Sequence, residues 1–334
     1  MNILTNLKLK IFEINANSLR GLNFHKGIVD YRKEIIPQHR HRIKKDKDFV
    51  CTLCGNNQGV FFLEWKEVGY KLFKCCSCDA VSPNIDTSTD DYVASMYDVD
   101  SYVDKFMRET HAQYEYRKNK FGKERYEYTI NRLNISANSK VLDIGCGAGY
   151  FLDVLKDNSI EYKGLEVASH FVEYCRSYHN LNVDSTSLEE ESDEYYDLIT
   201  MFDVLEHLSD PVNTFSVINK KLKPGGYCVA YTPNIFSIGY ELMGAKQNTL
   251  LPFEHLCFFN SKSLDFLVKK TGFKVETLEV YGLDIMDYLL MKEYEDGINY
   301  TDNLKDLMSI LQAVIDKDEI GNHFRITFKK IFNI

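Results

Sequence analysis

The first feature of this sequence that could carry chemistry is a glycine-rich turn. Residues 141–152 read Val-Leu-Asp-Ile-Gly-Cys-Gly-Ala-Gly-Tyr-Phe-Leu, so a hydrophobic strand runs into glycines at every second position and then into a helix. Glycine lets a backbone approach a ligand where a Cβ atom would collide, and the start of a helix presents unpaired N–H groups. We therefore predict a ligand site around Asp143, Gly145, Gly147 and Gly149.

The spacing of this turn narrows the class of ligand. It reads Asp-x-Gly-x-Gly-x-Gly, whereas dinucleotide sites carry Gly-x-Gly-x-x-Gly, so a cofactor without a pyrophosphate in the turn is favoured. Glu166 ends the next apolar strand about twenty residues later, where a carboxylate can accept hydrogen bonds from both hydroxyls of a ribose. The glycines alone would be weak evidence, because a structural turn or a nicotinamide site can share them.

Four cysteines form a second candidate site. Cys51-x-x-Cys54 and Cys75-x-x-Cys78 have the spacing of a zinc ribbon, and each pair can supply two thiolates to a tetrahedral S4 shell. The alternatives are two disulfides, which a reducing compartment disfavours, or a redox pair, which normally lies at a helix start in a thioredoxin-like unit. Four protein ligands leave no open position, so we expect structural zinc that holds a small module together.

The elements that must position these residues follow a regular order after residue 140. The apolar strands VLDIG, YKGLEV, YDLITMF and GGYCVAYTP are separated by helical patterns, and residues 273–280 read as one more strand. Such alternation is typical of βαβ units. The predicted fold class is therefore α/β, a mostly parallel sheet with helices on both faces.

Five motifs, taken together, resemble a known family. DIGCGAG, GLEV, FDVLEHLSDP, LKPGG and YTPN occur in this order between residues 143 and 234. In these motifs, residues 135–282 resemble the class I methyltransferases that use S-adenosylmethionine. The resemblance implies a Rossmann-like sheet of seven strands, an enzyme, and S-adenosylmethionine as cofactor.

The resemblance also implies roles for single residues. Asp143 and the three glycines would surround the amino-acid and sulfonium part of the cofactor, and Glu166 would hold the ribose. Phe202 and Asp203 would line the methionine side of the pocket. The family often has an acidic residue near the adenine, where this chain has Ser185-Thr186-Ser187-Leu188, so we expect Thr186 and Ser187 there.

Two histidines are candidates for the chemistry that such an enzyme needs. Methyl transfer to a hydroxyl requires alignment of the two reactants and the removal of one proton. His255, in a Glu-His-x-x-x-Phe segment of the kind that sugar methyltransferases carry, is expected to be the general base, with Glu254 orienting it or contacting the acceptor. His207 is the second candidate, in a Glu-His pair common in the family whatever the substrate. A purely structural role stays open for both histidines.

The net charge of the chain limits the class of methyl acceptor. The formal net charge of −9 opposes binding of a polyanion, so nucleic acid is disfavoured. The leading hypothesis is O-methylation of a small molecule or glycan precursor, such as a nucleotide-linked sugar in polysaccharide biosynthesis; C-methylation of a keto-sugar is a close variant. The alternatives are an RNA methyltransferase that uses the zinc ribbon to recognise its substrate, and a non-catalytic, cofactor-binding scaffold.

The chain divides into five predicted segments. They are a loosely structured lead-in with a basic run (1–48), a zinc-ribbon-like module (49–82), a tyrosine-rich helical connection (83–134), the methyltransferase domain (135–283) and a helical extension (284–334). The tyrosines of the connection, Tyr92, Tyr97, Tyr102, Tyr114 and Tyr116, are either packing residues or an aromatic lid. The extension could close the pocket, bind a partner or form a homodimer face.

No apolar run is long enough to span a bilayer, and no signal peptide is evident. We expect no integral membrane segment and a cytoplasmic location.

Overall fold

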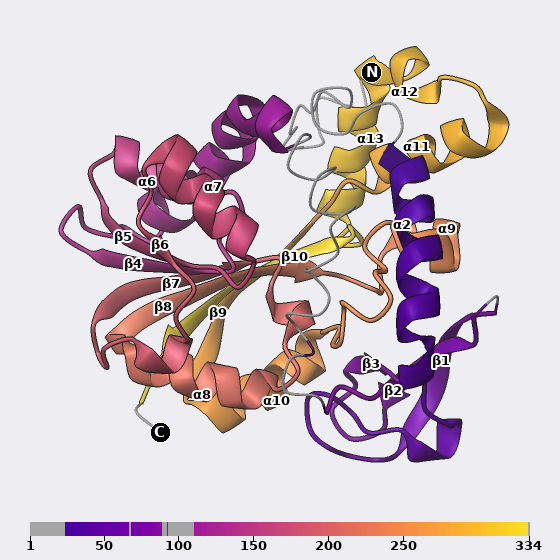
Figure 1. The fold of residues 1–334 in the computed structure, drawn as a ribbon, viewed down its shortest axis with the longest axis horizontal. Coiled ribbons are helices and arrows are strands. Elements are labelled where there is room, and N and C mark those ends of the chain that lie inside the picture. Colours follow the sequence, from indigo (N-terminus) through magenta and orange to yellow (C-terminus); the bar gives the residue numbers. More distant parts are fainter. Residues whose placement is uncertain (1–23, 67, 89–91, 93–109, 333–334) are drawn as a thin grey trace, which may run out of the picture.

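The computed structural model describes residues 24–66, 68–88, 92 and 110–332 (Figure 1). Its larger sheet has seven strands in the order β6-β5-β4-β7-β8-β10-β9. Their bounds are β4 Lys140–Ile144, β5 Glu161–Leu165, β6 Val183–Asp184, β7 Tyr196–Phe202, β8 Leu222–Pro233, β9 Phe273–Tyr281 and β10 His323–Lys330. The strands from β6 to β8 pair in parallel, and β10 runs antiparallel to both of its neighbours. The predicted mixed α/β fold is confirmed.

Helices cover both faces of this sheet, as Figure 1 shows. On one face α6 (Tyr150–Asp157) and α7 (Ser169–His179) pack on β4 and β7 through a core that includes Phe151 and Leu198. On the other face α8 (Pro211–Lys221) and α10 (Ser261–Thr271) enclose a second core that includes Phe215 and Leu267. Because both faces are covered, the central strands are apolar along most of their length.

The expectation for the last fifty residues was incomplete. Three helices are present, α11 (Asp284–Asp296), α12 (Tyr300–Asn303) and α13 (Lys305–Lys317), but the chain then returns as β10 and inserts between β8 and β9. Phe324, Ile326 and Phe328 are buried at alternate positions of that strand, which is the period of a strand with one apolar face. The alternating apolar residues of β10 form a short pattern in the sequence, and it is a weaker signal than the helical spacing of apolar residues before it. The strand was therefore not predicted.

A smaller antiparallel sheet carries the cysteine pairs. Its strands are β1 (Gly59–Trp65), β2 (Tyr70–Cys75) and β3 (Val81–Pro83), in that order. The segment before it was expected to be loosely structured, and this expectation is wrong for α2 (Phe24–His39). Ile35 and Ile36 of this helix are buried in a core that it shares with the small sheet and with residues 250–258.

The connecting segment is helical over residues 110–131, including α5 (Lys123–Tyr126), and packs on α6. Tyr114 is buried and stacks on the His179 ring, with 3.6 Å between the ring centroids. Tyr92 is also buried, whereas Tyr97 and Tyr102 lie outside the described residues. Of the residues that the structure describes, none belongs to a helix that is both long enough and apolar enough to span a membrane.

Candidate active site

The glycine turn joins the end of β4 to α6 in a backbone conformation that side chains resist. Gly145, Gly147 and Gly149 have φ values of 65°, 52° and 78°, in the left-handed region that favours glycine. A Cβ at Gly145 would lie 2.5 Å from Cγ2 of Val204, and one at Gly149 would lie 2.5 Å from Cδ1 of Leu181. A Cβ at Gly147 would meet no atom within 4 Å. Gly145 and Gly149 thus allow close packing, and Gly147 faces open space.

Glu166 lies against this turn, directly after β5. Its Oε2 accepts a hydrogen bond from the backbone N–H of Gly147 (2.8 Å), and its Oε1 accepts one from Ala168 (2.9 Å). Burial raises the pKa of the carboxyl, and these backbone donors oppose that shift. Gly147 and Glu166, about twenty positions apart in the sequence, are therefore in contact. A ribose site that uses both the glycine turn and Glu166 requires this contact. An open cradle at Gly147 beside a carboxylate with unused lone pairs fits an adenosyl cofactor.

Asp143 lies beneath the turn. It is buried, its Oδ1 accepts a 2.6 Å hydrogen bond from the Thr200 hydroxyl, and burial raises its pKa to about 7. Sequence reasoning did not find Thr200, which lies on β7 next to β4.

Phe202 ends β7 and Asp203 follows it beside the turn, because a Cβ at Gly145 would meet the next residue, Val204. Asp203 has a left-handed φ of 61° and lies close to a guanidinium and an imidazole, which the sequence analysis did not identify. Nη2 of Arg125 is 3.3 Å from Oδ2, and Nε2 of His323 is 3.7 Å from Oδ1. The Arg125 guanidinium also lies 4.4 Å from the centroid of the Phe202 ring.

Thr186 and Ser187 follow β6 and are exposed to solvent. The backbone carbonyl of Asp184, two residues earlier, accepts a hydrogen bond from the Glu166 N–H (2.9 Å). Ser187 begins a short 3-10 turn and accepts a hydrogen bond from the Glu189 N–H (3.2 Å). The pair therefore lies beyond the strand that adjoins Glu166, and its contact with adenine stays a prediction.

His207 and His255 meet in a buried cluster beyond the ends of β7 and β8. Their ring centroids are 4.6 Å apart and the rings are perpendicular. Both Nε2 atoms face Oε1 of Glu206, at 3.8 Å from His207 and 3.9 Å from His255. We call Glu206, His207 and His255 the histidine cluster. The sequence named both histidines but did not predict that they touch, since they lie on different loops.

Burial dominates the electrostatics of this cluster. It lowers the pKa of His207 to about 4 and that of His255 well below its ordinary value, so both imidazoles are neutral. It also raises the pKa of Glu206, and the nearby Asp203 raises it further. The His255 side chain is only 5% exposed, while that of His207 is 18% exposed and gives the cluster its more accessible side.

Glu254 is held by the helix that the sequence did not predict. The Tyr31 hydroxyl of α2 donates a hydrogen bond to its carboxylate, and burial raises the pKa of Glu254 to about 7. The next residue of this helix is Arg32. Its guanidinium is buried and donates hydrogen bonds to the backbone carbonyls of Gln247 (2.6 Å) and Leu250 (2.8 Å). Helix α2 thus fixes the loop that carries Glu254 and His255.

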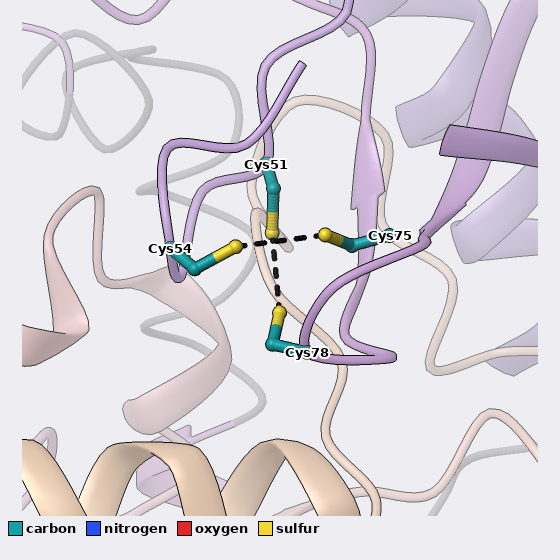
Figure 2. A group of neighbouring side chains, drawn as sticks. All are labelled: Cys51, Cys54, Cys75 and Cys78. Carbon is teal, nitrogen blue, oxygen red and sulfur yellow. Dashed lines mark hydrogen bonds between the residues drawn. The ribbon is translucent and has the colours of Figure 1, made fainter. Parts of the chain in front are cut away.

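The four predicted metal ligands converge at one point, as Figure 2 shows. The Sγ atoms of Cys51 and Cys78 are 3.6 Å apart, those of Cys54 and Cys75 are 3.5 Å apart, and all four lie within 4.8 Å of one another. Zn–S bonds of about 2.3 Å in a tetrahedron require S–S separations of about 3.8 Å. All nine cysteines are free thiols. The donor set and its dimensions fit a zinc ion.

A cavity of about 440 Å³ opens between β9, α13 and the helix that carries Glu124, and no residue of the glycine turn, Glu166 or the histidine cluster lines it. Tyr281 lines it and contacts His323, with 5.6 Å between the ring centroids. Arg325 pairs with Glu124 (2.9 Å) and covers the Tyr281 ring. Apolar and acidic side chains share the wall, including Leu278, Met286, Met308, Glu279 and Asp316.

Comparisons with known proteins agree with this geometry. Residues 114–278 match a family model described as a methyltransferase domain. Over 134 residues the chain is 31% identical to a ubiquinone biosynthesis O-methyltransferase of Aliivibrio fischeri, covering 37% of this chain and 57% of that protein. Over 164 residues it is 33% identical to a probable S-adenosylmethionine-dependent methyltransferase of Mycolicibacterium smegmatis, covering 47% and 61%.

Among solved structures, a SAM-dependent methyltransferase from Archaeoglobus fulgidus has 23% sequence identity and a TM-score of 0.43, covering 62% of this chain and 94% of that one. The chain spans 57% to 61% of the length of the two curated relatives described above. The four-cysteine module and the region after residue 278 lie outside the family match.

Proposed function

We propose that this protein is a class I, S-adenosylmethionine-dependent methyltransferase that transfers a methyl group to a hydroxyl of a small molecule, a sugar or a nucleotide-linked sugar; the match of residues 114–278 to a methyltransferase domain supports it. One observation carries the proposal. The glycine turn follows the carboxyl end of β4, Glu166 follows β5, and Glu206 and His207 of the histidine cluster follow β7, the strand next to β4. This is where ligands bind in open α/β sheets.

The cradle would hold the cofactor. Glu166 would accept hydrogen bonds from the ribose, Gly147 would leave room for the backbone to approach, and Phe202 and Asp203 would line the methionine side. S-adenosylmethionine supplies a methyl group on a positively charged sulfur. The carboxylate of Asp203, at the end of β7, adds a negative charge beside that position.

The histidine cluster would remove the proton from the acceptor. Neutral imidazoles can accept a proton, and burial keeps His207 and His255 neutral. The same burial lowers their pKa values and so makes each imidazole a weaker base, which the carboxylate of Glu206 beside both rings would offset once a proton is accepted. Two members of the cluster, Glu206 and His207, follow Asp203 by three and four residues, and His255 lies on another loop. An acceptor bound between the cluster and the cradle would face both the proton acceptor and the methyl donor.

The acceptor class follows from the relatives and from the charge of the chain. The relatives named for ubiquinone biosynthesis are O-methyltransferases. The net charge of −9 opposes a nucleic-acid acceptor.

We also propose that Cys51, Cys54, Cys75 and Cys78 hold structural zinc. Thiolates bind zinc only when they are reduced, so the proposal includes a reducing compartment, the cytoplasm. The site has no open position, and we assign no catalytic step to it.

The test is transfer of labelled methyl from S-adenosylmethionine into nucleotide-linked sugars and into host extract split into small-molecule, glycan, protein and RNA fractions. Label in the sugar or small-molecule fractions is expected. His255→Ala should lose turnover and keep its affinity for S-adenosylhomocysteine, while His41→Ala, at an exposed position, should behave as the unaltered protein. Label that appears in RNA and disappears on nuclease digestion would overturn the small-molecule assignment.

A further inference from the structure

The three groups of the histidine cluster face one another without bonding. Nε2 of His207 and Nε2 of His255 lie 3.8 and 3.9 Å from Oε1 of Glu206, beyond hydrogen-bond distance. The ligand atoms of all three residues lie within 4.8 Å of one another. Two imidazole nitrogens and one carboxylate oxygen therefore surround a common point inside the protein.

This arrangement leaves a buried acid without a cation. Glu206 is 1% exposed, and no lysine or arginine within residues 24–66, 68–88, 92 and 110–332 forms an ion pair with it. An ionised carboxylate in such surroundings is costly unless a positive charge or a metal compensates it.

The surrounding bonds orient the three groups toward the common point. The Thr232 hydroxyl donates to Oε2 of Glu206 (2.9 Å), which leaves Oε1 facing the imidazoles. The Glu206 carbonyl accepts the N–H groups of Leu256 (2.7 Å) and Cys257 (3.1 Å), so the two loops are tied together beside His255. The ring of His207 packs edge-on against the ring of His255, with 4.6 Å between their centroids, which fixes the orientation of both imidazoles.

We propose that Glu206, His207 and His255 bind a divalent ion of the first transition series. Two imidazoles and one carboxylate form a donor set that such ions prefer, with positions left open for other ligands. Bonds of about 2.1 Å to two ligands span at most about 4.2 Å, so both carboxylate–imidazole separations fit. The open positions lie on the side of His207, whose side chain is 18% exposed.

The consequence for the reaction rests on the proposed function. An acceptor hydroxyl bound to the ion becomes more acidic and gives its proton to solvent. Its oxygen then forms a bond to the methyl carbon, the carbon–sulfur bond breaks, and the electron pair stays on sulfur. This arrangement replaces the general-base role proposed above for the histidine cluster and keeps the rest of the proposed function, the cofactor cradle and methyl transfer to a hydroxyl.

The chain offers a way to count this ion separately from zinc. Four thiolates favour zinc, whereas Mn²⁺ binds thiolates poorly and accepts a carboxylate and water. Protein that holds one zinc per chain, so that only the four-cysteine site is filled, should bind one Mn²⁺ per chain when it is titrated with MnCl₂ and followed by electron paramagnetic resonance. Glu206→Gln and His255→Ala should each weaken Mn²⁺ binding at least tenfold with the zinc content unchanged, and His41→Ala should bind Mn²⁺ as the unaltered protein does.

Absence of Mn²⁺ binding, or binding by both cluster variants that is as tight as binding by the unaltered protein, would overturn the proposal. If His255→Ala fails to fold, His207→Ala serves, because that side chain is partly exposed. Methyl transfer should be lost after chelation that spares the zinc and should return with MnCl₂; a full rate after chelation would refute a catalytic ion. Mn²⁺ binding without methyl transfer to any acceptor would support the site and count against the proposed function.

Discussion

Val81 and Phe258 exchange both of their backbone hydrogen bonds, at 3.0 and 2.8 Å. Val81 comes three residues after the fourth cysteine of the zinc-ribbon-like module, and Phe258 comes three residues after His255. The Tyr70 hydroxyl of the same module accepts a hydrogen bond from the Phe253 N–H (3.3 Å). The four-cysteine module is therefore a support for the loop that carries His255.

This support predicts that loss of zinc affects the distant histidine. Cys78→Ser should lose the zinc and reduce methyl transfer, because β3 no longer holds the loop in place. A ligand present at a thousand times its Kd contributes about 4 kcal/mol to stability, and a loss of that order is expected in urea unfolding. Cys76→Ser alters an exposed cysteine and is the matched control. Equal zinc content in the two variants would contradict the assignment.

Two glycine variants distinguish the cost of a strained backbone from the loss of space for the cofactor. Gly147→Ala and Gly225→Ala both place a side chain at positive φ (52° and 76°) where no atom lies within 4 Å of the new Cβ. Each should cost about 1 kcal/mol in stability. Only Gly147→Ala should also lower the affinity for S-adenosylhomocysteine, by at least tenfold in calorimetry. Equal affinities would show that the cofactor does not pass over Gly147.

The stability of the fold should depend on pH through Asp143. Its pKa in the folded protein, about 7, lies above its ordinary value of 3.8, so the stabilisation it gives is complete below about pH 4 and is lost as the pH rises to about 7. Asp143→Asn removes this titration. The unfolding free energy of the variant, relative to the unaltered protein, should rise by roughly 2 kcal/mol between pH 5.5 and 8. A constant difference would contradict the assignment.

Removal of the Tyr31 hydroxyl should destabilise the protein, and more so at high pH. Glu254 is ionised above its pKa of about 7, where the lost donor matters most. Tyr31→Phe should cost roughly 1 to 3 kcal/mol at pH 8 and less at pH 6, as measured by urea unfolding. Tyr178→Phe is the control, because that tyrosine is 69% exposed. A pH-independent cost would argue against the bond to the carboxylate.

The sequence predicted the parts of the site that depend on local spacing. The glycine turn, the position of Glu166 and the cysteine pairs are set by residues close together in the chain. In the structure Gly147 contacts Glu166, and the four thiols lie close to one another. The histidine cluster required two loops whose contact depends on the backbone bonds of Glu206. Arg125, His323 and Tyr31 reach the site from distant segments, and no local pattern marks them.

Strand β10 has a consequence for how the chain is made. Residues 323–330 lie between β8 and β9, so a ribosome must synthesise nearly all of this chain before the sheet can close. Until then β8 and β9 present unpaired edges, which can pair with other chains. Nascent protein should therefore depend on chaperones until β10 is released, and a stop codon before His323 should give aggregates instead of a smaller folded domain.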